Sequence, residues 1–463
     1  MPNPAPGPTT PARSPAYQAG VERLLASYRA VPTGSTVRLA KKSSNLFRAR
    51  AATSTPGLDV SGLTGVLRVD VAARTADVAG MCTYDDLVAA TLPFGLAPLV
   101  VPQLRTITLG GAVTGLGIES TSFRNGLPHE SVLELDVLTG DGEIVTARPT
   151  GEHADLFRGF ANSYGTLGYA TRLRIELEPV APFVALRHVR FHDLDAAVEA
   201  IAAISVSREH EGTRVDYLDG VVFTATEIYL SVGTGTDEPG PTSDYTGQQV
   251  YYRSIQQRTS DRLSIADYLW RWDTDWFWCS RAFGAQQPTI RRLWPRRLRR
   301  SSFYSKLIGL DARFSVADRL EARHGRPPRE RVVQDVEVPL ARTAEFLRWF
   351  LAEVPIEPLW LCPVRLRDTR TWDLYPMAPE ATYVNVGFWS SVARTPGDDG
   401  ATNRAIEAQV SAVDGHKSLY SDSFYDADTF AALYGGDRYP ILKQRYDPRG
   451  RLLDLYAKAV RRQ

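Results

Sequence analysis

The stretch that decides the fold is "ITLGGAVTGLGIES", residues 107–120, which holds four glycines in fourteen residues. Glycine-rich turns can cradle phosphate with their backbone N–H groups. They also occur simply as tight turns that require positive φ. Gly115-Leu116-Gly117 is followed by Ser120 where a Rossmann fingerprint needs its third glycine, and no P-loop lysine follows. Two interpretations stay open: a loop that lines a pyrophosphate without a helix behind it, and a tight turn, which the glycines alone favour.

The segments around this stretch alternate between helical and strand patterns. Residues 17–31 and 83–95 have apolar side chains at helical spacing. Thr83 is the expected cap of the second helix, and Gly95 is its expected end. Residues 64–80 and 132–149 alternate with a period of two, and the second range contains the turn Thr139-Gly140-Asp141-Gly142. These patterns predict two helices and two β-hairpins in the first part of the chain.

The second part of the chain repeats a theme of strands and covering helices. Residues 195–206 and 342–354 are typical of helices. Residues 215–235 predict a β-hairpin, and residues 381–391 predict a further strand. The sequence thus predicts the α+β class, with an antiparallel sheet in the second part.

Bulk composition limits the classes of function. The chain has 463 residues, with 43% apolar and 23% charged residues and a net charge of +1. This length suits two domains, and the neutral charge argues against a nucleic-acid partner. Three cysteines without a CxxC pair favour a reducing cytoplasm. Residues 1–15 are rich in proline without the apolar core of a secretory signal, and we expect a disordered leader there. No apolar stretch has the length of a membrane span.

Several motifs together resemble one superfamily of flavoproteins. Residues 92–145 contain the pair Gly110-Gly111, the turn "GTLGYAT" follows at 165–171, and "KQRYDPRGRL" stands at 443–452. These segments resemble the FAD-binding domain of the vanillyl-alcohol oxidase and p-cresol methylhydroxylase (PCMH) superfamily. The resemblance implies a two-part PCMH-type FAD-binding domain and an α+β substrate or cap domain. The implied division is a leader at 1–15, the FAD domain at 16–180, the cap domain at 181–420, and a segment at 421–463 that returns to the FAD domain.

Four further motifs narrow the resemblance. They are "GIESTSFRNGL" (117–127), "RVVQDVEVPL" (331–340), "PLWLCPV" (358–364) and "LYSDSFYDADTF" (419–430). They resemble the sterol Δ24-reductase (Diminuto) branch. They also resemble actinobacterial reductases of 10-methylene fatty-acyl chains in 10-methylstearate biosynthesis, and more distantly decaprenyl-phosphoryl-ribose oxidase.

The resemblance also implies which residues hold the cofactor. FAD is expected to be non-covalent, because residues 38–50 contain no histidine that could tether it, and His129 is interpreted as a surface-loop histidine. NADPH is the implied electron donor, although no second dinucleotide fingerprint is present, and no metal is expected. The first-loop residues depart from the usual form because they include no glycine. The implied FAD-binding residues are Lys42, Ser43, Ser44, Asn45, Gln103, Thr108, Leu109, Gly110, Gly111, Gly115, Leu116, Gly117, Ile118, Gly165, Gly168, Ala170 and Tyr420.

The implied reaction adds a hydride and a proton across an isolated C=C bond. Because no carbonyl polarises that bond, an acid must protonate the less substituted carbon, and hydride then reaches a tertiary, cation-like centre. Burial can keep a carboxyl group protonated, and aromatic faces can stabilise the positive charge. Glu119 and Asp422 are the candidate acids, with Tyr425 and Tyr217 as weaker candidates. The alternatives are a loop carboxylate bound to backbone N–H groups for Glu119 and a helix-capping region for Asp422.

Residues 268–306 hold five of the nine tryptophans, and "RRLWPRRLRR" at 291–300 contains six arginines. A nucleic-acid patch and a packed Trp helix followed by a solvated Arg loop are two interpretations. A membrane surface fits better, with Trp at the interface and Arg at anionic headgroups. We therefore expect a protein that is peripheral on the inner face of the plasma membrane. Its partners would be a phospholipid acyl substrate and a lipid methyltransferase that acts upstream.

The sequence thus predicts an FAD-dependent reductase of an isolated C=C bond in a lipid. A 10-methylene fatty-acyl chain is favoured because the abundance of Arg and Ala is typical of actinobacteria. The alternatives are a sterol Δ24-reductase, an FAD-dependent oxidase of an alcohol or lipid-linked sugar, and a membrane-binding scaffold without catalysis.

Overall fold

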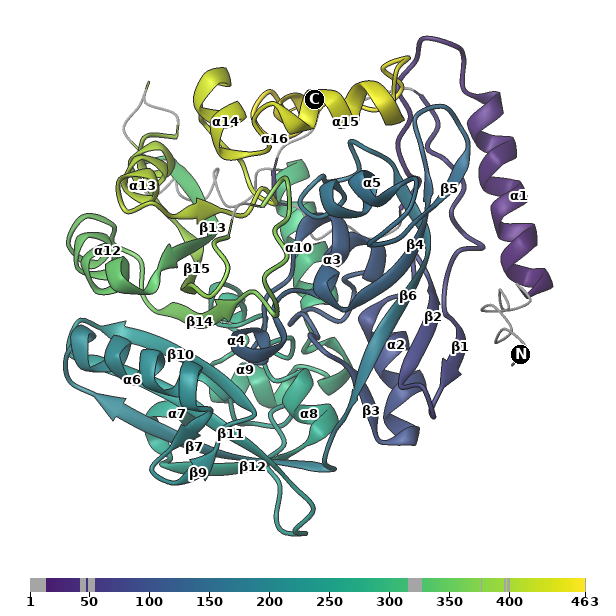
Figure 1. The fold of residues 1–463 in the computed structure, drawn as a ribbon. Helices are drawn as coiled ribbons and strands as arrows, with labels where there is room; N and C mark the ends of the chain where they lie inside the picture. The colour runs from purple at the N-terminus through teal and green to yellow at the C-terminus, as the bar shows by residue number, and fades with distance from the viewer. Residues whose placement is uncertain are drawn as a thin grey trace.

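The computed structural model describes residues 14–41, 47–48, 55–314, 327–375, 377–394, 397 and 400–462. These residues build two large antiparallel sheets that lie side by side, each with its own helices (Figure 1). This arrangement confirms the predicted α+β class. Among the described helices, none combines the length and apolarity that a membrane crossing requires.

The first sheet has the strand order β1-β2-β6-β4-β5, and β3 pairs with the far end of β6. The two predicted hairpins are confirmed, since β1 pairs with β2 and β4 pairs with β5, both antiparallel. Gly142 has φ +83°, the left-handed conformation that the β4–β5 turn requires. The strands are β1 (Val66–Asp70), β2 (Thr75–Ala79), β3 (Leu96–Pro98), β4 (Val132–Leu138), β5 (Ile144–Ala147) and β6 (Tyr169–Pro179).

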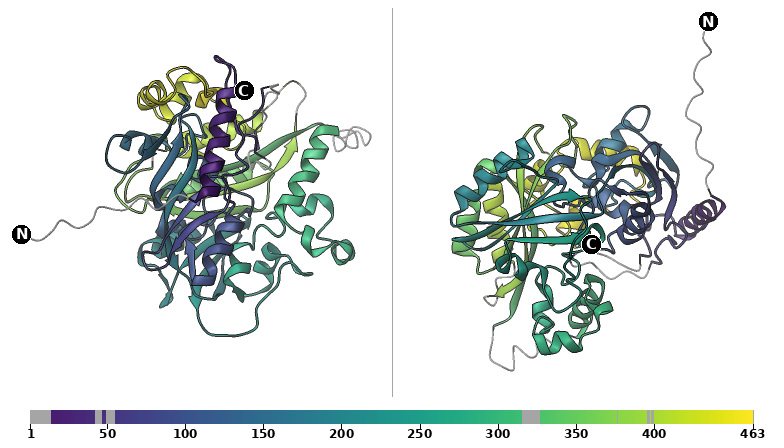
Figure 2. Two further views of the ribbon diagram at one scale, coloured as in Figure 1. Left: turned by 90° about the vertical axis from the view of Figure 1, so that its right-hand side faces the viewer. Right: turned by 90° about the horizontal axis from the view of Figure 1, so that it is seen from below.

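Short helices surround this sheet. Thr83 caps α2 by accepting a hydrogen bond from the backbone N–H of Asp86 at 3.1 Å, and Gly95 (φ +66°) ends the turn that follows, as predicted. Helix α1 runs along the outer side of the sheet (Figure 2). The helices are α1 (Pro15–Ala30), α2 (Tyr84–Thr91), α3 (Leu109–Gly115), α4 (Ser122–Asn125) and α5 (Ala154–Gly159), with 3₁₀ turns at Leu92–Phe94 and Pro128–Ser131.

The second sheet has the strand order β12-β7-β11-β10-β14-β15-β13-β16. The predicted hairpin is β10 and β11, and the predicted strand at 381–391 is the central part of β15. Its strands are β7 (Phe183–Phe191), β10 (Tyr217–Thr224), β11 (Glu227–Thr236), β12 (Ser260–Ser264), β13 (Arg329–Pro339), β14 (Leu359–Arg365), β15 (Thr382–Ala393) and β16 (His416–Lys417); β8 (Glu209–His210) and β9 (Thr213–Arg214) form a small separate ribbon.

Helices α6 (Leu194–Ser207), α12 (Leu340–Glu353) and α13 (Ala401–Ala412) cover the outer face of this sheet (Figure 1). Successive side chains of a strand point to opposite faces. On β13, Val332, Val336 and Val338 therefore pack beneath these helices, together with Val384 and Val386 of β15. The side chains at the alternate positions of β13 point to the opposite face, toward the first sheet. This alternation decides which side chains of β13 can reach the space between the two sheets.

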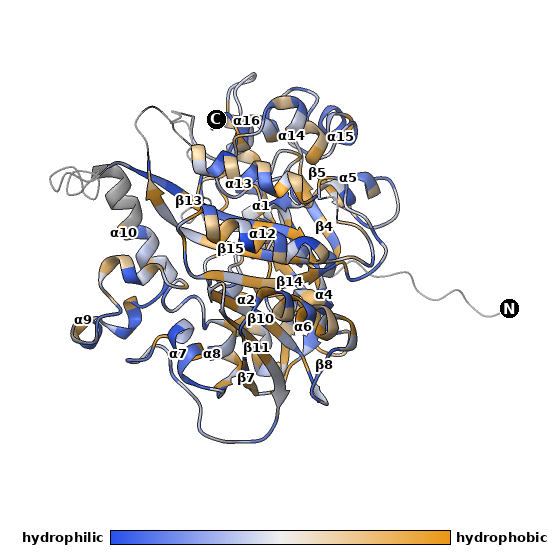
Figure 3. Cartoon of the chain, turned by 90° about the vertical axis from the view of Figure 1, so that its left-hand side faces the viewer, coloured by the Kyte–Doolittle hydropathy of each residue, from blue (hydrophilic) through white to orange (hydrophobic). Residues whose placement is uncertain are grey.

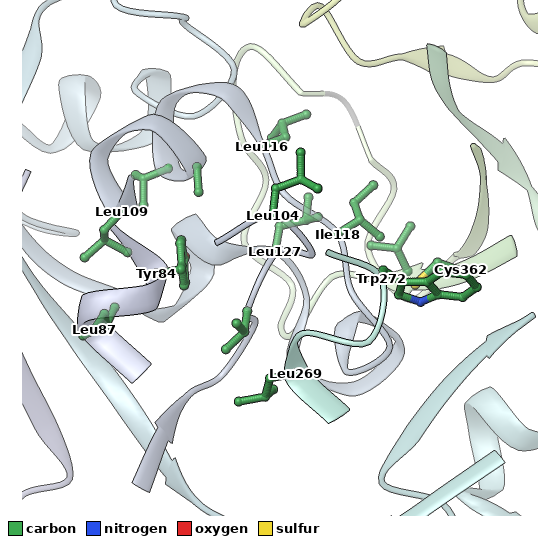
Figure 4. Close-up of a cluster of buried hydrophobic side chains, with 14 of the residues drawn as sticks. Tyr84, Leu87, Leu104, Leu109, Leu116, Ile118, Leu127, Leu269, Trp272 and Cys362 are labelled. Atoms are coloured by element: carbon green, nitrogen blue, oxygen red, sulfur yellow. The ribbon is translucent and has the colours of Figure 1, made fainter. Parts of the chain in front are cut away.

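A continuous apolar core joins the two sheets. Figure 4 shows Tyr84, Leu87 and Leu109 from the helices beside the first sheet. Leu104 and Ile118 lie in the middle, followed by Trp272 and by Cys362 of the second sheet. All of these side chains are buried. The two sheets therefore share one core rather than folding as two loosely linked domains.

The end of the chain returns to the first sheet. After β16 come helices α14 (Ala427–Leu433), α15 (Arg438–Tyr446) and α16 (Leu455–Ala459). Helix α15 lies beside α5, and α14 contacts α16 (Figure 1). The backbone N–H of Gly140 donates to the carbonyl of Tyr446 at 2.8 Å, and that of Val37 donates to the carbonyl of Arg451 at 2.8 Å. The closing segment thus fastens both the first helix and the hairpin turn.

The Trp/Arg-rich segment does not present its tryptophans to the surface. Trp270, Trp272, Trp276 and Trp278 are buried in the shared core, and Trp294 is half-buried. The expected role of these rings at a membrane interface is corrected, because they pack on the second sheet instead. The region beyond them projects from the body of the molecule (Figure 2). It contains α9 (Pro288–Leu293) and α10 (Ser301–Phe314), with 3₁₀ turns at Cys279–Phe283 and Arg296–Leu298. Helices α7 (Tyr251–Gln257) and α8 (Ile265–Leu269) precede the tryptophans and pack on the second sheet.

Candidate active site

A cavity of about 600 Å³ lies between the two sheets. It is lined by residues of α3, of β6, of β13–β15 and of the closing segment. This volume is within the range of cofactor and ligand sites, which lie preferentially where domains meet. Of the residues predicted to bind FAD, those that line the cavity are Gln103, Thr108, Gly110, Gly111, Gly115, Leu116, Gly117, Ile118, Gly165, Ala170 and Tyr420.

The glycine stretch forms helix α3, which corrects the expected helix-free loop. Thr108 caps this helix and accepts a hydrogen bond from the Gly111 N–H at 3.2 Å. The Gly110 N–H donates to Gly80 O at 3.0 Å, and a Cβ at Gly110 would lie only 2.7 Å from that oxygen. Gly110 is thus required for the close packing of α3 on the end of β2. Because its first N–H groups are already bonded, α3 does not offer them as an open phosphate cradle.

The turn that follows α3 has backbone N–H groups without an internal hydrogen bond among the described residues, and a second turn faces it. Leu116 has φ +65°, and no hydrogen bond is made by the N–H groups of Gly117 and Ile118 within the described part of the chain. The facing turn holds Tyr164 (φ +48°) and Gly165 (φ +72°), and the Tyr164 hydroxyl donates to Gly115 O at 2.8 Å. Successive N–H groups in turns of this kind bind anions.

Cationic side chains line the same cavity. Lys41 donates to Thr108 Oγ1 at 3.1 Å, and Lys458 donates to the carbonyls of Tyr164 and Gly165 at 3.1 and 3.2 Å. A Cβ at Gly111 would lie 2.8 Å from Thr108 Oγ1 and 3.6 Å from Lys41 Nζ, so glycine keeps this corner clear. Ammonium groups and open N–H groups are the donors that a pyrophosphate requires. The residues present therefore fit FAD.

Aromatic side chains form another part of the lining. Phe277 stacks on Trp389 with ring centroids 4.2 Å apart, and the ring centroids of Trp360 and Phe277 are 5.5 Å apart. Phe47 contacts Trp276 at 5.6 Å and Tyr420 at 5.7 Å. We call these six residues the aromatic wall: Phe47, Trp276, Phe277, Trp360, Trp389 and Tyr420.

Part of the aromatic wall has a strained backbone conformation. Trp276 and Phe277 both have positive φ, 48° and 58°, a conformation that bulky residues rarely adopt. Such outliers persist only where the surroundings enforce them, and they cluster at functional sites. Here the enforcing contacts are the stacking of Phe277 on Trp389 and the hydrogen bond from Trp278 Nε1 to Trp389 O at 3.2 Å.

One carboxyl group lines the cavity within this wall. Asp335 of β13 accepts a hydrogen bond from Asn385 Nδ2 at 3.2 Å and another from the Tyr420 hydroxyl. The Tyr420 hydroxyl in turn accepts one from Trp389 Nε1 at 3.2 Å. Burial raises the pKa of Asp335 to about 7, although the Asn385 and Tyr420 hydrogen bonds oppose that shift.

A second acid stands two residues further along the same strand. Glu337 is fully buried, and its Oε1 accepts a hydrogen bond from Ser418 Oγ at 3.0 Å. Burial and, to a smaller extent, the nearby Asp335 carboxyl group together raise the pKa of Glu337 to about 8. Asp335 and Glu337 share a face of β13 because they are two residues apart. Both side chains therefore take up protons near neutral pH.

The motif reasoning missed these two acids, although the sequence carried a signal for them. "RVVQDVEVPL" was used only for its resemblance to a family. Its Asp335 and Glu337 stand at alternate positions in a strand pattern rich in valine. That spacing places two carboxyl groups on one buried face, which is unusual without a functional reason.

The candidate acid Glu119 does not line the cavity. Its Oε1 lies 2.7 Å from the Arg271 guanidinium, which also pairs with Asp219 at 2.7 Å. Burial raises the pKa of Glu119 to about 7, and Arg271 acts in the opposite direction. Glu119 points away because α3 and its turn direct Gly117 and Ile118 to the cavity and Glu119 into the shared core. The three side chains Glu119, Arg271 and Asp219 form what we call the arginine cluster.

The other two candidate acids also lie away from the cavity. Asp422 is 3.4 Å from Arg462, and its backbone carbonyl accepts a hydrogen bond from Lys417. Tyr425 is buried with Phe430 and Tyr434 in a small cluster of the closing segment. The chain turns outward after Tyr420, so Tyr420 lines the cavity whereas Asp422 and Tyr425 do not. The weaker candidate Tyr217 packs against Tyr268 at 4.7 Å, also outside the cavity lining.

Some predicted cofactor positions have structural roles or lie outside the described residues. The Leu109 side chain is in the shared core. A Cβ at Gly168 would lie 2.4 Å from Val137 Cγ1, so this glycine serves the packing of β6 on β4 rather than the cavity lining. His129 is buried beside Trp372, which corrects its interpretation as a surface residue, because its 3₁₀ turn tucks inward. Lys42, Ser43, Ser44 and Asn45 lie outside the described residues.

Comparison with known proteins bears on this site. Residues 23–148 match the model of a family described as an FAD binding domain. The chain is 24% identical over 416 residues to the Delta(24)-sterol reductase of Homo sapiens, covering 86% of this chain and 76% of that protein. It is 24% identical over 445 residues to the enzyme of the same name from Arabidopsis thaliana, covering 87% and 76%. A shorter match, 34% identical over 158 residues, is to cytokinin dehydrogenase 7 of Oryza sativa subsp. japonica, with 34% and 30% covered.

The matched domain contains α3 and most strands of the first sheet, so it includes the cavity-lining Gly110, Gly111, Gly115 and Gly117. The matches to sterol reductases extend over most of the chain, beyond that domain. Taken with a cavity whose donors fit FAD, these findings make the chain an FAD-dependent oxidoreductase with a PCMH-type FAD-binding domain, similar to the sterol reductases along most of its length.

Proposed function

We propose that the protein reduces an isolated C=C bond in a lipid. The observation that carries this proposal is the Asp335 carboxyl group, which lines the cavity within the aromatic wall. A bond without an adjacent carbonyl must be protonated before it can accept hydride. An acid whose pKa is near 7 holds the required proton at neutral pH. When bound, reduced FAD supplies an electron pair together with one hydrogen.

The aromatic wall supports the same chemistry. Protonation of the alkene leaves positive charge on the more substituted carbon. The faces of Trp389, Trp360 and Phe277 are negative, and a cation within about 6 Å of such a ring is stabilised by roughly 0.5–2 kcal/mol. The same rings offer an apolar surface to a hydrocarbon and exclude water that would capture the cation. An oxidase of an alcohol would instead need a base in this position.

Two lipid substrates fit this proposal. A 10-methylene fatty-acyl chain, linked to a phospholipid, gives a tertiary cation when the CH₂ carbon of its methylene branch is protonated. In that case an enzyme that installs the methylene branch, a lipid methyltransferase, would act upstream. A sterol with a Δ24 double bond gives a tertiary cation in the same way, and it is favoured by the similarity to Delta(24)-sterol reductases. We propose NADPH as the electron donor for either substrate.

The experiment is a comparison of both substrates under anaerobic conditions. The purified holoprotein is reduced with NADPH, and the bleaching of the flavin absorbance measures that half-reaction. A micellar phospholipid with a 10-methylene chain, or a Δ24 sterol, is then added. We expect reoxidation of the flavin by one of them and a product that is two hydrogens heavier by mass spectrometry. Rapid flavin reduction by a sugar or lipid-linked alcohol, without reoxidation by either alkene, would favour the oxidase alternative.

We further propose that the projecting segment contacts an anionic phospholipid surface on the inner face of the plasma membrane. Leu293 is 85% exposed at the end of α9, and it is flanked by the exposed side chains of Arg292, Arg296, Arg297 and Arg300. In Figure 3 this segment stands out from the sheets and carries both hydrophilic and hydrophobic residues. One inserted apolar side chain ringed by cations suits such a surface.

Vesicle flotation tests this second proposal. We expect binding to vesicles that contain anionic lipid, weaker binding at high salt, and no binding to neutral vesicles. The double variant Arg296→Ser/Arg297→Ser should bind less, whereas Arg190→Ser on β7 serves as the control. Equal binding of neutral and anionic vesicles would contradict the proposal.

A further inference from the structure

We propose that Asp335 is the residue that donates the proton to the alkene, with Tyr420 and Asn385 holding its carboxyl group in place. The inference deepens the proposed reduction and rests on it. It replaces the acids predicted from sequence motifs, Glu119 and Asp422, by a residue that lines the cavity.

The strand register places Asp335 opposite a glycine, which has no side chain. Asp335 of β13 pairs with Gly387 of β15, which also pairs with Trp360 of β14. A Cβ at Gly387 would lie 2.4 Å from Asp335 Oδ1 and 2.6 Å from Trp389 Cη2. The absent side chain thus lets the carboxyl group and the indole ring meet over the same strand. An acid and a cation-stabilising ring are brought side by side by one glycine.

The Asp335 carboxyl group has neutral hydrogen-bond partners within the described part of the chain. Among the described residues, no lysine or arginine forms an ion pair with Asp335, which is partly buried, whereas the fully buried Asp219 pairs with Arg271 at 2.7 Å. The partners of Asp335 are the amide of Asn385 and the hydroxyl of Tyr420. Neutral donors can accompany either protonation state, so the carboxyl group can lose and regain a proton without breaking a salt bridge.

The groups that face Asp335 come from three elements. Glu337 comes from the same strand, Asn385 from β15, and Tyr420 from the closing segment; Tyr164 also senses the charge of Asp335. Burial raises the pKa of each of the two tyrosines above its usual range, so both are neutral. Glu337, with a pKa raised by burial to about 8, is also mostly protonated at pH 7. Asp335 is therefore the group of this set that titrates nearest to neutral pH.

The step balances as follows in atoms and electrons. The O–H bond of Asp335 breaks, and the π electron pair of the alkene forms a C–H bond at the less substituted carbon. The cationic carbon is then reduced by the electron pair and hydrogen that reduced FAD supplies, so the alkene becomes an alkane and the cofactor is oxidised. The Asp335 carboxylate regains its proton from water that enters the cavity.

The test separates the alkene half-reaction from flavin reduction. Holoproteins of the wild type, Asp335→Asn and Asp422→Asn are reduced with dithionite, which does not depend on the natural electron donor. Each is then mixed with the alkene that reoxidises the wild type. A missing general acid costs about 10²- to 10⁴-fold. We expect Asp335→Asn to slow reoxidation by at least about 100-fold and Asp422→Asn to stay within about twofold of the wild type.

Two further readouts distinguish proton donation from a loss of structure. The wild-type rate of reoxidation should fall as the pH rises through about 7, and the residual rate of Asp335→Asn should lack this dependence. The variant should still bind FAD, which its flavin absorbance after desalting reports. In D₂O the wild-type product should carry one deuterium at the less substituted carbon.

Distinct outcomes separate the two proposals. If the wild type is reoxidised by an alkene and Asp335→Asn reacts within about tenfold of it with the same pH profile, Asp335 is not the donor, while the reductase function stands. If no alkene reoxidises the reduced wild type, both proposals are overturned. Loss of activity in Asp422→Asn alone would restore the motif-based candidate.

Discussion

Two groups of buried acids lie on either side of the aromatic wall, and they differ in what compensates their charge. In the arginine cluster, Arg271 lies within 2.7 Å of both Glu119 and Asp219. The hydrogen-bond donors that Asp335 and Glu337 have among the described residues are neutral. Asp219 also accepts hydrogen bonds from Trp272 Nε1 at 2.9 Å and Trp360 Nε1 at 3.2 Å.

The comparison shows that burial alone does not make an acid catalytic. A carboxylate that is fixed by a guanidinium group and two indoles cannot release and regain a proton cheaply. It serves instead to hold Arg271 and the ring of Trp360 in position. A carboxyl group with neutral partners and access to a cavity can change its charge at neutral pH. The first group is suited to structure and the second to proton transfer.

The largest expected effect comes from removing the cation of the arginine cluster. Arg271→Met would leave two acids buried without a counter-charge, which typically costs about 3–5 kcal/mol. We expect the free energy of unfolding to fall by about that amount in urea titrations at pH 7. Arg281→Met, at an exposed position outside the cluster, is the control and should change it by less than about 0.5 kcal/mol. A small change in Arg271→Met would mean that the cluster is not held by charge.

The second effect concerns the pH dependence of stability at Asp335. Its folded pKa, about 7, lies above the usual 3.8. Its protonation therefore stabilises the fold at low pH, and this contribution is lost as the pH rises through about 7. In the FAD-free protein, Asp335→Asn should be more stable than the wild type by up to about 4 kcal/mol at pH 8. The two proteins should be similar near pH 4, and thermal unfolding across this range measures the difference.

A third, smaller effect is expected at Glu119. Glu119→Gln keeps an acceptor for the Ser120 N–H, which lies 2.9 Å from Oε2, and it leaves Arg271 paired with Asp219. We expect a loss of about 1 kcal/mol in the free energy of unfolding and alkene reduction within about threefold of the wild type. Abolished reduction in a folded, FAD-loaded Glu119→Gln protein would show that the arginine cluster takes part in the chemistry.

The smallest effect is expected from the hydroxyl group of Tyr420. Its hydrogen bond favours the charged form of Asp335 and so lowers the pKa of that carboxyl group. Tyr420→Phe should therefore move the midpoint of the pH–rate profile upward, by about half a pH unit. Single-turnover reoxidation of the flavin between pH 6 and 9 would measure the shift. A downward shift would mean that the hydroxyl group stabilises the protonated acid.

Much of the local structure followed from pattern and turn chemistry. The hairpins β1–β2, β4–β5 and β10–β11, the cap at Thr83 and the end at Gly95 were all predicted, because they depend on residues close together in sequence. The glycine stretch was read as a loop since its helix, α3, has only seven residues and includes three glycines. Packing against Gly80 stabilises that helix, and no local signal reports such packing.

The sequence by itself determined the fold class, the FAD-binding segment and the expectation of an acidic residue near the flavin. Only the tertiary structure decided which acidic side chain lines the cavity. Glu119 follows a cavity-lining glycine turn, yet its side chain enters the shared core and meets Arg271 from 152 residues away. Asp335, Asn385 and Tyr420 come from three separate elements and meet through strand register. Charge compensation depends on such long-range contacts, and it decides whether a buried carboxyl group is structural or can transfer a proton.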